Sequence, residues 1–456
     1  MNIKLRLTFL SFLEFFIWGA WLITVANYWF DNKHWGDVEF GKVFSTMGIA
    51  ALFMPAISGI IADRWINAEK LLGVYHLVGA AILCYLPEVN DPNVFFWVIL
   101  TYMIFYMPTL ALANTVSYTA LKNSNQDIIK SFPPIRVWGT IGFIAAMWLT
   151  NLSGSKDTAN QFYIAAVASA ILGVYSFSLP ACPPNKLQEN KSLIDALGLK
   201  AFKLFANYKM AIFFIFAMFL GAALQLTNAY GDVYLNSYKF NPNYYDSFVI
   251  KYSTIIMSIS QISETLFILA IPFFLKRFGI KKVILISMAA WVLRFGLFAY
   301  GNPADGLWMI ILSCIVYGMA FDFFNVSGSL YVDTQVDSKI RASAQGVFMM
   351  MTNGIGAIIG SLTSSYFIAK YFTLRFTNTE ALTQYMEVGT DNQAYKNITA
   401  FNKVLPDGSF ERVVEIKEWT NIWLTFALYA AVVAILFAFM FKHKHEPEKL
   451  GNVAHG

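Results

Sequence analysis

The sequence STIIMSISQISETLFILAIPFF, from Ser253 to Phe274, decides the fold of this chain. It is apolar and long enough to cross the roughly 30 Å hydrocarbon core of a bilayer as a helix. Gln261 and Glu264 lie near its middle and, being three residues apart, share one helical face. An ionisable side chain at this depth is costly and typically functional. The sequence therefore predicts a membrane-spanning helix that carries a functional carboxylate.

The composition extends this prediction to the whole chain. Hydrophobic residues make up 57% of the 456 and charged residues 13%, whereas soluble domains carry about 25% charged residues. The net charge of +5 is too small to indicate nucleic acid as a partner, and the three cysteines have no metal-ligating spacing. The sequence therefore predicts an all-α polytopic membrane protein, with no metal site and no cofactor.

About twelve apolar segments are long enough to span a bilayer. Their expected ranges are 7–29, 41–62, 70–87, 94–121, 132–151, 161–180, 209–234, 250–275, 282–300, 306–331, 342–370 and 419–441. A polar connector over 183–208 separates a six-helix half at 1–182 from a second half at 209–456. The second half contains an outer loop insertion at about 371–417, which is polar and shows no recognisable chemistry.

Basic residues gather in the turns on the side of the N-terminus. These turns hold Arg64, Lys70, Lys122, Lys130, Lys276, Arg277, Lys281, Lys282, Lys339 and Arg341, and the C-terminal tail adds Lys442, Lys444 and Lys449. The opposite short loops hold only a few, such as Lys33, Lys156 and Lys239. Because cytoplasmic loops are enriched in Lys and Arg, both termini are expected in the cytoplasm.

A weak internal repeat supports the division into halves. The stretch GIIADR at 59–64 resembles the front of the Gly-x-x-x-Asp-Arg-x-Gly-Arg-Lys signature of the major facilitator superfamily. The stretch KRFGIKK at 276–282 resembles its basic rear. Repeated halves with a site between them at the bilayer midplane are typical of transporters. Asp63 and Arg64 are then expected to gate or stabilise one conformational state, the alternative being a solvated helix end.

Polar and aromatic side chains lie at similar depth on four predicted helices. They are Arg136, Thr140 and Phe143 on the fifth, Gln225 and Asn228 on the seventh, Thr254, Ser258, Gln261, Glu264 and Thr265 on the eighth, and Tyr317 and Phe321 on the tenth. Polar groups on one face indicate a water-filled cavity. The amides could instead join helices, the rings could simply pack, and Arg136 could reach the membrane edge. Glu264 is the hardest to explain by packing alone.

Other charged or titratable residues inside the predicted helices compete for a role. Glu14 in the first helix is a second candidate for binding a proton. Asp322 is another candidate, although it could pair structurally with Arg294 in the ninth helix. Asp232, near the outer end of its helix, is expected to be solvated. His76 stands alone, which favours a hydrogen-bonded packing histidine over a ligand.

Long stretches of the chain resemble the bacterial nucleoside:proton symporters of the major facilitator superfamily, the nucleoside permease type. The most specific are FPPIRVWGTIGFI at 132–144, KMAIFFIFAM at 209–218, IIMSISQISETLFILAIPFF at 255–274, YGMAFDFFNVSGS at 317–329 and IRASAQGVFMMMTNG at 340–354. The resemblance implies a nucleoside cavity lined by Arg136, Thr140, Phe143, Gln225, Asn228, Gln261, Glu264, Tyr317 and Phe321. Two departures from the family pattern are Glu14, in place of a glutamine, and the longer outer insertion.

The resemblance implies nucleoside transport, and the chemistry of the candidate side chains is consistent with binding a nucleoside. We expect proton-coupled uptake of nucleosides such as uridine or adenosine across a bacterial inner membrane, by alternating access and as a monomer. Aromatic rings stack on bases, and amides can bind base edges or ribose hydroxyls. Glu264, with Glu14 and Asp322 in reserve, would couple the proton. The alternative is a facilitator or symporter of another neutral polar solute, such as a sugar. An enzyme is not expected, because no nucleophile–base or metal constellation occurs at helical spacing.

Overall fold

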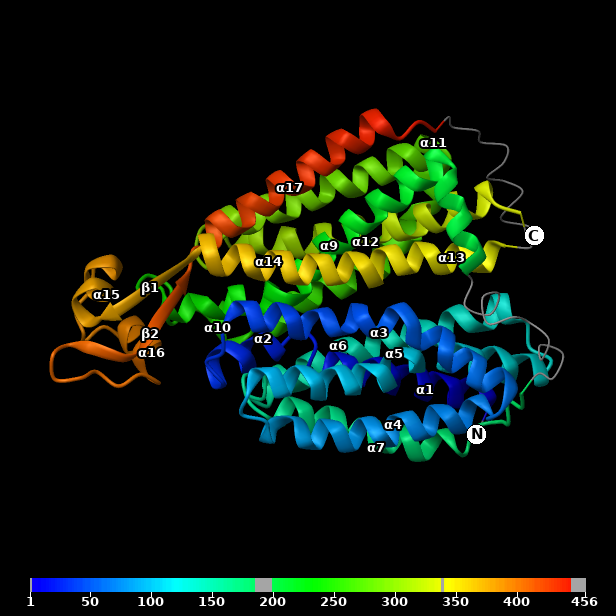
Figure 1. Ribbon diagram of the computed structural model, residues 1–456, viewed down its shortest axis with the longest axis horizontal. Helices are drawn as coiled ribbons and strands as arrows, with labels where there is room; N and C mark the ends of the chain where they lie inside the picture. Colours follow the sequence, from blue (N-terminus) through cyan, green and yellow to red (C-terminus); the bar gives the residue numbers. More distant parts are fainter. Residues whose placement is uncertain (1, 185–198, 338–339, 444–456) are drawn as a thin grey trace.

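The computed structural model describes residues 2–184, 199–337 and 340–443, and its helices lie in two groups side by side (Figure 1). The N-terminal helix group comprises α1 (Ile3–Gly19), α2 (Val25–Asn27), the π-helical turn η1 (Tyr28–Asn32), α3 (Asp37–Arg64), α4 (Ala68–Tyr85), η2 (Leu86–Glu88), α5 (Pro92–Asn123), α6 (Ile128–Leu152) and α7 (Asn160–Ser176). Within it, α1 packs against α6 and α4 against α7. This group is drawn in blue to teal.

The C-terminal helix group follows a short 3-10 helix, η4 (Leu199–Ala206). It comprises α9 (Tyr208–Asn236), η5 (Ser237–Phe240), α10 (Phe248–Lys251), α11 (Ser253–Tyr300), α12 (Leu307–Gln335), α13 (Arg341–Met349), the π-helical segment η6 (Met350–Gly356), α14 (Ala357–Tyr371) and α17 (Trp419–Met440). Helices α11 and α12 pack along one another, and α17 lies against α11. The 185–198 part of the predicted connector lies outside the described residues.

Several predicted spans differ from the observed helices. Within the described ranges, nine helices are long and apolar enough to cross a membrane. The predicted span 7–29 is interrupted after Gly19, where a turn leads into α2 and η1. The predicted spans 250–275 and 282–300 run on as α11, with a kink at Gly279 (φ 77°, ψ 165°). Glycine suits this kink because a left-handed φ is unfavourable for residues with a Cβ. The count of twelve spans stays a prediction.

The insertion at 371–417 is a folded unit and not merely a polar loop. It contains β1 (Thr373–Asn378), α15 (Thr379–Met386), α16 (Gln393–Thr399) and β2 (Ser409–Lys417). The two strands pair antiparallel, with Thr373 opposite Lys417. Its own small core consists of Leu382, Met386, Ala394, Tyr395, Phe410 and Val414. The expectation of an all-α chain is therefore wrong for this segment, because a few well-spaced apolar residues suffice to build a core in a polar stretch.

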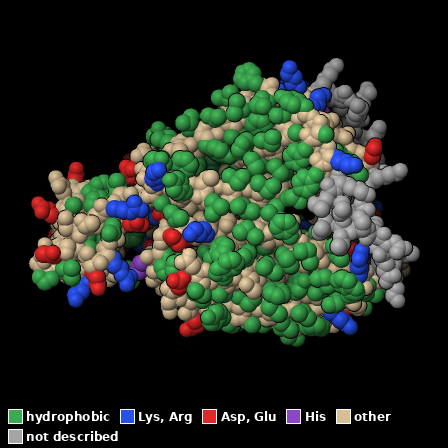
Figure 2. Space-filling model, viewed as in Figure 1, with side chains coloured by type: hydrophobic (Ala, Val, Ile, Leu, Met, Phe, Trp, Pro, Cys, Tyr) green, Lys and Arg blue, Asp and Glu red, His purple; other side chains and the backbone are tan. Residues whose placement is uncertain are grey.

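The insertion projects from the end of the molecule opposite the two termini (Figure 1). We call these ends the insertion side and the terminal side. Figure 2 shows hydrophobic side chains over the middle of the helical body, with most visible charged side chains toward its two ends and on the insertion. This distribution fits a body that lies in a bilayer with its ends in water.

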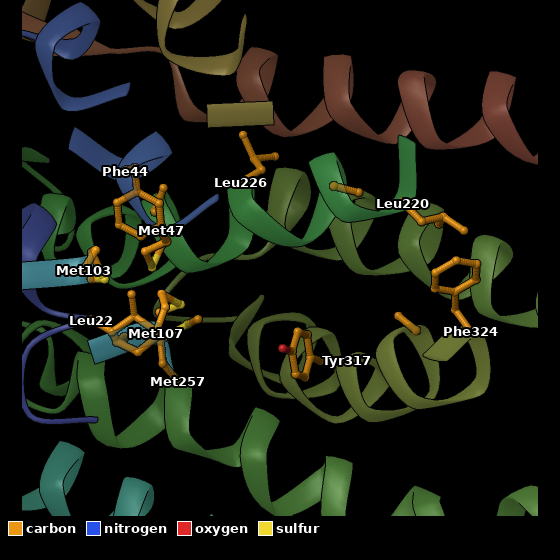
Figure 3. Close-up of a cluster of buried hydrophobic side chains, with 14 of the residues drawn as sticks. Leu22, Phe44, Met47, Met103, Met107, Leu220, Leu226, Met257, Tyr317 and Phe324 are labelled. Carbon is orange, nitrogen blue, oxygen red and sulfur yellow. The ribbon is translucent and has the colours of Figure 1, made fainter. Parts of the chain in front are cut away.

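Buried apolar side chains join the two groups (Figure 3). Leu22, Phe44 and Met107 of the N-terminal group belong to the same core as Met257 and Leu226 of the C-terminal group. Because these side chains fill the space near the insertion side, the helix groups are held together there by dense packing.

Polar contacts between the groups lie on the insertion side as well. Lys239 pairs with Asp31 at 2.7 Å, and Lys417 of β2 pairs with Asp37 of α3 at 3.2 Å. The Trp148 indole donates to Ser258 Oγ at 2.8 Å. Considering only residues that the structure describes, every hydrogen bond between the groups lies toward this side. We call this set of contacts the insertion-side seam.

Candidate functional site

Arg136 of α6 occupies a central place between charged groups of both helix groups. Its guanidinium carbon lies 3.9 Å from the centre of the Phe15 ring on α1. It interacts electrostatically with Glu264 of α11 and with Glu14 of α1. The side chain therefore points into the protein and does not reach for the membrane edge. Its position next to the ring is typical of a cation–π contact.

The position of Arg136 follows from how closely α1 and α6 approach. A Cβ at Gly142 would lie 2.1 Å from the carbonyl oxygen of Phe12, so only glycine allows this packing. Thr140 and Phe143 follow Arg136 on the same face of α6 and remain partly accessible. The Phe143 ring meets Trp18 edge-on, with centroids 6.4 Å apart.

Glu264 lies on α11 where this helix touches α12. A Cβ at Gly318 would lie 2.6 Å from the backbone nitrogen of Glu264, so a glycine is needed at this contact. The close approach brings Tyr317 and Asp322 of α12 near the Glu264 carboxylate, with which both interact electrostatically. Two neighbouring carboxylates repel when both are ionised, which suits a place where a proton binds and leaves.

Aromatic rings form one wall beside Glu264. The Tyr317 and Phe321 rings stack with centroids 5.7 Å apart and planes 5° apart. Trp291 meets Tyr317 edge-on at 5.9 Å. Phe321 is only partly buried, and this leaves it open to contact with a ligand. A flat ligand could continue the stack, because offset stacking of aromatic groups is favourable.

Unpaired polar atoms lie next to these groups. The Oε1 atoms of Gln225 and Gln261 are buried without a hydrogen-bond partner among the described residues. The same holds for Asp322 Oδ2 and Trp18 Nε1. Asn228, one turn from Gln225, is partly accessible. A buried unpaired polar atom costs about 1–3 kcal/mol, so these atoms are suited to a polar ligand that satisfies them.

The structure does not contain the predicted pair between Arg294 and Asp322. Arg294 is fully buried, and its Nη1 donates to the carbonyl oxygen of Ser313 at 2.6 Å. Its guanidinium lies 4.7 Å from the Tyr317 ring centre. Ser313 lies about 13 Å from Asp322 along the axis of α12, nearer the insertion side. Because Arg294 is bound to Ser313, it is too far from Asp322 to pair with it. The sequence shows the depth of each residue only coarsely, which is why the pairing was wrong.

Asp232 is buried in the insertion-side seam and not solvated. Only 1% of it is exposed. Its carboxylate accepts hydrogen bonds from the Asn27 amide and from Thr254 Oγ1, the latter at 3.1 Å. Thr254 and Ser258 therefore belong to the seam, although their spacing with Gln261 predicted that they face a cavity. The sequence could not show that the groups close over this end of α11.

Glu14 and His76 form a contact that the sequence did not predict. Glu14 is 0% exposed, and its Oε2 lies 2.9 Å from His76 Nε2 on α4. Thr109 of α5 donates to Glu14 Oε1 at 2.6 Å. His76 is hydrogen-bonded as expected but does not stand alone. Neither residue has a sequence pattern that reveals its partner, because they lie on different helices.

The remaining predicted residues lie apart from this cluster. Asp63 and Arg64 end α3 on the terminal side, and their predicted gating role stays a prediction. Across the part of the chain that the structure describes, no group of three or more His, Cys, Asp or Glu residues could hold a metal.

Two groups of long apolar helices that carry charged, amide and aromatic side chains within them are typical of a multi-pass membrane transporter. The sequence model of the family described as "Nucleoside H+ symporter" matches residues 1–446. The chain belongs to this family.

Characterised relatives are similar over nearly their whole length. The chain is 47% identical to the xanthosine permease of Escherichia coli (strain K12) over 451 residues, 99% of this chain and 98% of that protein. It is 47% identical to the nucleoside permease NupG of the same organism over 446 residues, 98% of this chain and 97% of that protein. The crystal structure of the nucleoside transporter NupG matches with a TM-score of 0.83, covering 97% of this chain and 100% of that chain.

Proposed function

We propose that this protein carries nucleosides across a membrane together with protons. The observation that carries the proposal is the electrostatic interaction of Arg136 of α6 with Glu264 of α11, which belong to opposite helix groups. A site formed by both groups can be opened to either side when the groups rock against each other. We take the groups to be two six-helix halves, 1–182 and 209–456, joined by the connector 183–208.

The substrate is proposed to bind between the aromatic wall and the amides. The base would be held by stacking on Phe143, Tyr317 and Phe321. Stacking accepts any nucleobase, because every base has a flat face. Gln225, Asn228 and Gln261 would bind base edges or ribose hydroxyls, since an amide both donates and accepts. Thr140 adds a hydroxyl on the N-terminal side. Arg136 is the one basic side chain among the nine proposed substrate-binding residues, and this favours a nucleoside over a nucleotide.

Glu264 is proposed to link proton binding to substrate binding. When ionised it can accept two hydroxyl bonds from a ribose and can attract Arg136. When protonated it releases Arg136 and becomes a donor. Asp322, which interacts with Glu264, is the alternative proton carrier on the same helix group, and Glu14 is the one on the other group.

Both termini are proposed to lie in the cytoplasm of a bacterium, with the protein a monomer in the inner membrane. The basic residues of the terminal-side turns support this orientation. The insertion side would then face outward. Because the insertion-side seam is closed by packed and hydrogen-bonded side chains, the structure corresponds under this proposal to a state that is closed toward the outside.

Uptake of radiolabelled uridine and adenosine into energised vesicles tests the function. We expect accumulation that a protonophore abolishes and that excess unlabelled nucleoside, but not excess sugar, competes away. Glu264→Gln should lose accumulation and keep exchange of internal for external uridine. Glu415→Gln, which alters a carboxylate of the insertion paired with Arg375, is the matched control and should behave as the unmodified protein. Accumulation of uridine against a gradient by Glu264→Gln would show that Glu264 does not couple the proton.

A further inference from the structure

Glu14 belongs to a buried hydrogen-bonded cluster whose members come from four helices. Glu14 of α1 contacts His76 of α4 at 2.9 Å and Thr109 of α5 at 2.6 Å. The other ring nitrogen of His76, Nδ1, lies 3.2 Å from Ser169 Oγ of α7. Glu14 and His76 are 0% and 1% exposed. A carboxyl group and an imidazole so deeply buried require a definite arrangement of protons.

The hydrogen bonds of Ser169 determine where these protons lie. Its hydroxyl donates to the carbonyl oxygen of His76 at 2.8 Å. A hydroxyl has one proton to donate, so Ser169 Oγ must accept at the second contact, and His76 Nδ1 must carry a proton. Thr109 Oγ1 lies 2.6 Å from Glu14 Oε1 and 2.5 Å from the carbonyl oxygen of Tyr106. With its single proton shared between these two acceptors, Glu14 Oε1 carries no proton of its own. His76 Nε2 then faces Glu14 Oε2 either as an imidazolium N–H beside a carboxylate or as a bare nitrogen beside a carboxylic acid.

Both arrangements place one proton between Glu14 and His76 and give the pair a net charge of zero. Loss of this proton leaves a carboxylate facing a lone pair of the ring nitrogen, and thus a buried anion without a charged partner in direct contact. Such an anion is strongly unfavourable unless a nearby cation compensates it.

Arg136 is a cation near this pair. Ionisable groups that interact electrostatically with Glu14 include Tyr102 and Tyr106 of α5 and Arg136 of α6. The Tyr106 hydroxyl donates to the Glu14 carbonyl oxygen at 2.8 Å, so it is not free to neutralise the carboxylate. Arg136 lies over the ring of Phe15, the next residue after Glu14. On its other side it interacts with Glu264.

We infer that Glu14 and His76 form a second proton-binding site, in the helix group opposite Glu264, whose occupancy controls Arg136. The inference rests on the proposed function. A proton that arrives at the deprotonated pair forms one N–H or O–H bond and cancels the charge of Glu14. Arg136 is then attracted only by Glu264 and by the substrate. When the proton leaves, Glu14 competes for Arg136 and the nucleoside is held less tightly.

The pH dependence of nucleoside affinity tests this site. The dissociation constant of uridine is measured by calorimetry with the purified full-length protein from pH 5 to pH 8.5. Glu14→Gln replaces the carboxyl group by a neutral amide of the same shape and therefore imitates the protonated pair. We expect it to bind uridine like the unmodified protein at acid pH. At the alkaline end of the range it should bind uridine more tightly than the unmodified protein, by up to about tenfold for each pH unit.

Glu69→Gln is the matched control. Glu69 is also a buried carboxylate on α4, 3% exposed, and it accepts from the backbone nitrogen of Cys182 at 2.8 Å. Glu69 lies outside both proposed proton sites. The uridine affinity of Glu69→Gln, plotted against pH, should therefore run parallel to that of the unmodified protein. If the Glu14→Gln curve is parallel as well, whether coincident or offset, Glu14 does not titrate with binding and the inference is overturned.

A measurement on the unmodified protein covers the case in which Glu14→Gln does not fold. Calorimetry in buffers of different ionisation enthalpy counts the protons taken up with each uridine. If both Glu264 and the Glu14–His76 pair bind a proton, more than one proton must be taken up for each uridine bound within this pH range. Uptake of one proton or fewer for each uridine overturns the inference. If uridine does not bind at all, the proposed function itself fails. If uridine binds and is accumulated while the affinity curves stay parallel, only the second site is refuted.

Discussion

The ion pair between Lys417 and Asp37 is expected to stabilise closure of the insertion side. Lys417 belongs to β2 of the insertion and Asp37 begins α3 of the N-terminal group. Their side chains are 11% and 1% exposed and 3.2 Å apart. The Lys417 ammonium also lies 4.0 Å from the centre of the Phe30 ring. These contacts join the two helix groups, so they must break when the groups separate on this side.

The size of the effect follows from the burial of Asp37. Removing one partner of a buried ion pair costs about 3–5 kcal/mol, because the other charge is left unpaired. Tyr230 still donates to Asp37 Oδ1 at 3.3 Å, and water can enter from the nearby surface, which offsets part of the loss. In the open state Asp37 is hydrated, so the loss of Lys417 costs that state no free energy. Lys417→Met should therefore destabilise the closed state by about 2 kcal/mol, a factor of about 30 in the conformational equilibrium.

Thiol labelling measures this equilibrium directly. Ser258 is 1% exposed in the insertion-side seam, so Ser258→Cys can react with a membrane-impermeant reagent only when the seam opens. The exposed native Cys84 is replaced by serine, and Cys182 and Cys314 are buried. When the closed state dominates, the labelling rate is proportional to the open population. Lys417→Met should then raise the labelling rate about 30-fold.

The matched control is Arg375→Met. Arg375 pairs with Glu415 at 2.9 Å, but both are on the insertion and partly exposed, so this pair does not join the helix groups. Exposed ion pairs contribute about 0–1 kcal/mol, and the labelling rate should stay within a few-fold of the parent. Equal rates for Lys417→Met and Arg375→Met would refute the view that the insertion stabilises closure.

Three further outcomes are expected. Gly318→Ala should lower the melting temperature and abolish uptake, because a Cβ there would lie 2.6 Å from the α11 backbone and such overpacking costs about 1–3 kcal/mol. Gly296→Ala on α11 meets no atom within 4 Å, so its melting temperature should not fall. Gln225→Leu removes a buried amide whose Oε1 is unpaired; it should leave the melting temperature equal or higher while raising the KM for uridine at least tenfold, and an unchanged KM would remove Gln225 from the site. Burial lowers the pKa of His34 below 6.5, so its packing against Phe401, at 4.8 Å between ring centres, is stabilising above pH 6.5 and is lost as pH falls through the lowered pKa. The melting temperature of His34→Gln should decrease less between pH 7 and pH 5 than that of the unmodified protein, and equal decreases would contradict this.

The family was predictable from the sequence, which also named candidate residues for the site. The apolar segments, the basic turns and the stretch around Glu264 indicated a polytopic transporter, because the cost of placing polar groups in hydrocarbon constrains membrane sequences strongly. The polar and aromatic residues at mid-depth could be named for the same reason. The distance of a residue along its helix gives its depth in the membrane only coarsely.

Only the tertiary structure decided which of these residues meet. The rotation and approach of helices depend on close contacts such as those at Gly142 and Gly318, and neither contact has a signature in the sequence. Such contacts place Arg136 near Glu264, and the fold keeps Arg294 away from Asp322. They also pair residues of different helices, as in the Glu14–His76 cluster.

The tertiary structure also decided which polar residues are buried in the insertion-side seam and that the insertion is folded. Asp232 and Ser258 are polar residues near a helix end, and the sequence alone describes them equally well as solvated or as buried. Burial of a polar group depends on whether a partner from another segment satisfies it. The sequence by itself determined the class of the protein and named candidate residues for the middle of the membrane. The tertiary structure determined the pairing of that chemistry, since pairing depends on contacts between residues far apart in the chain.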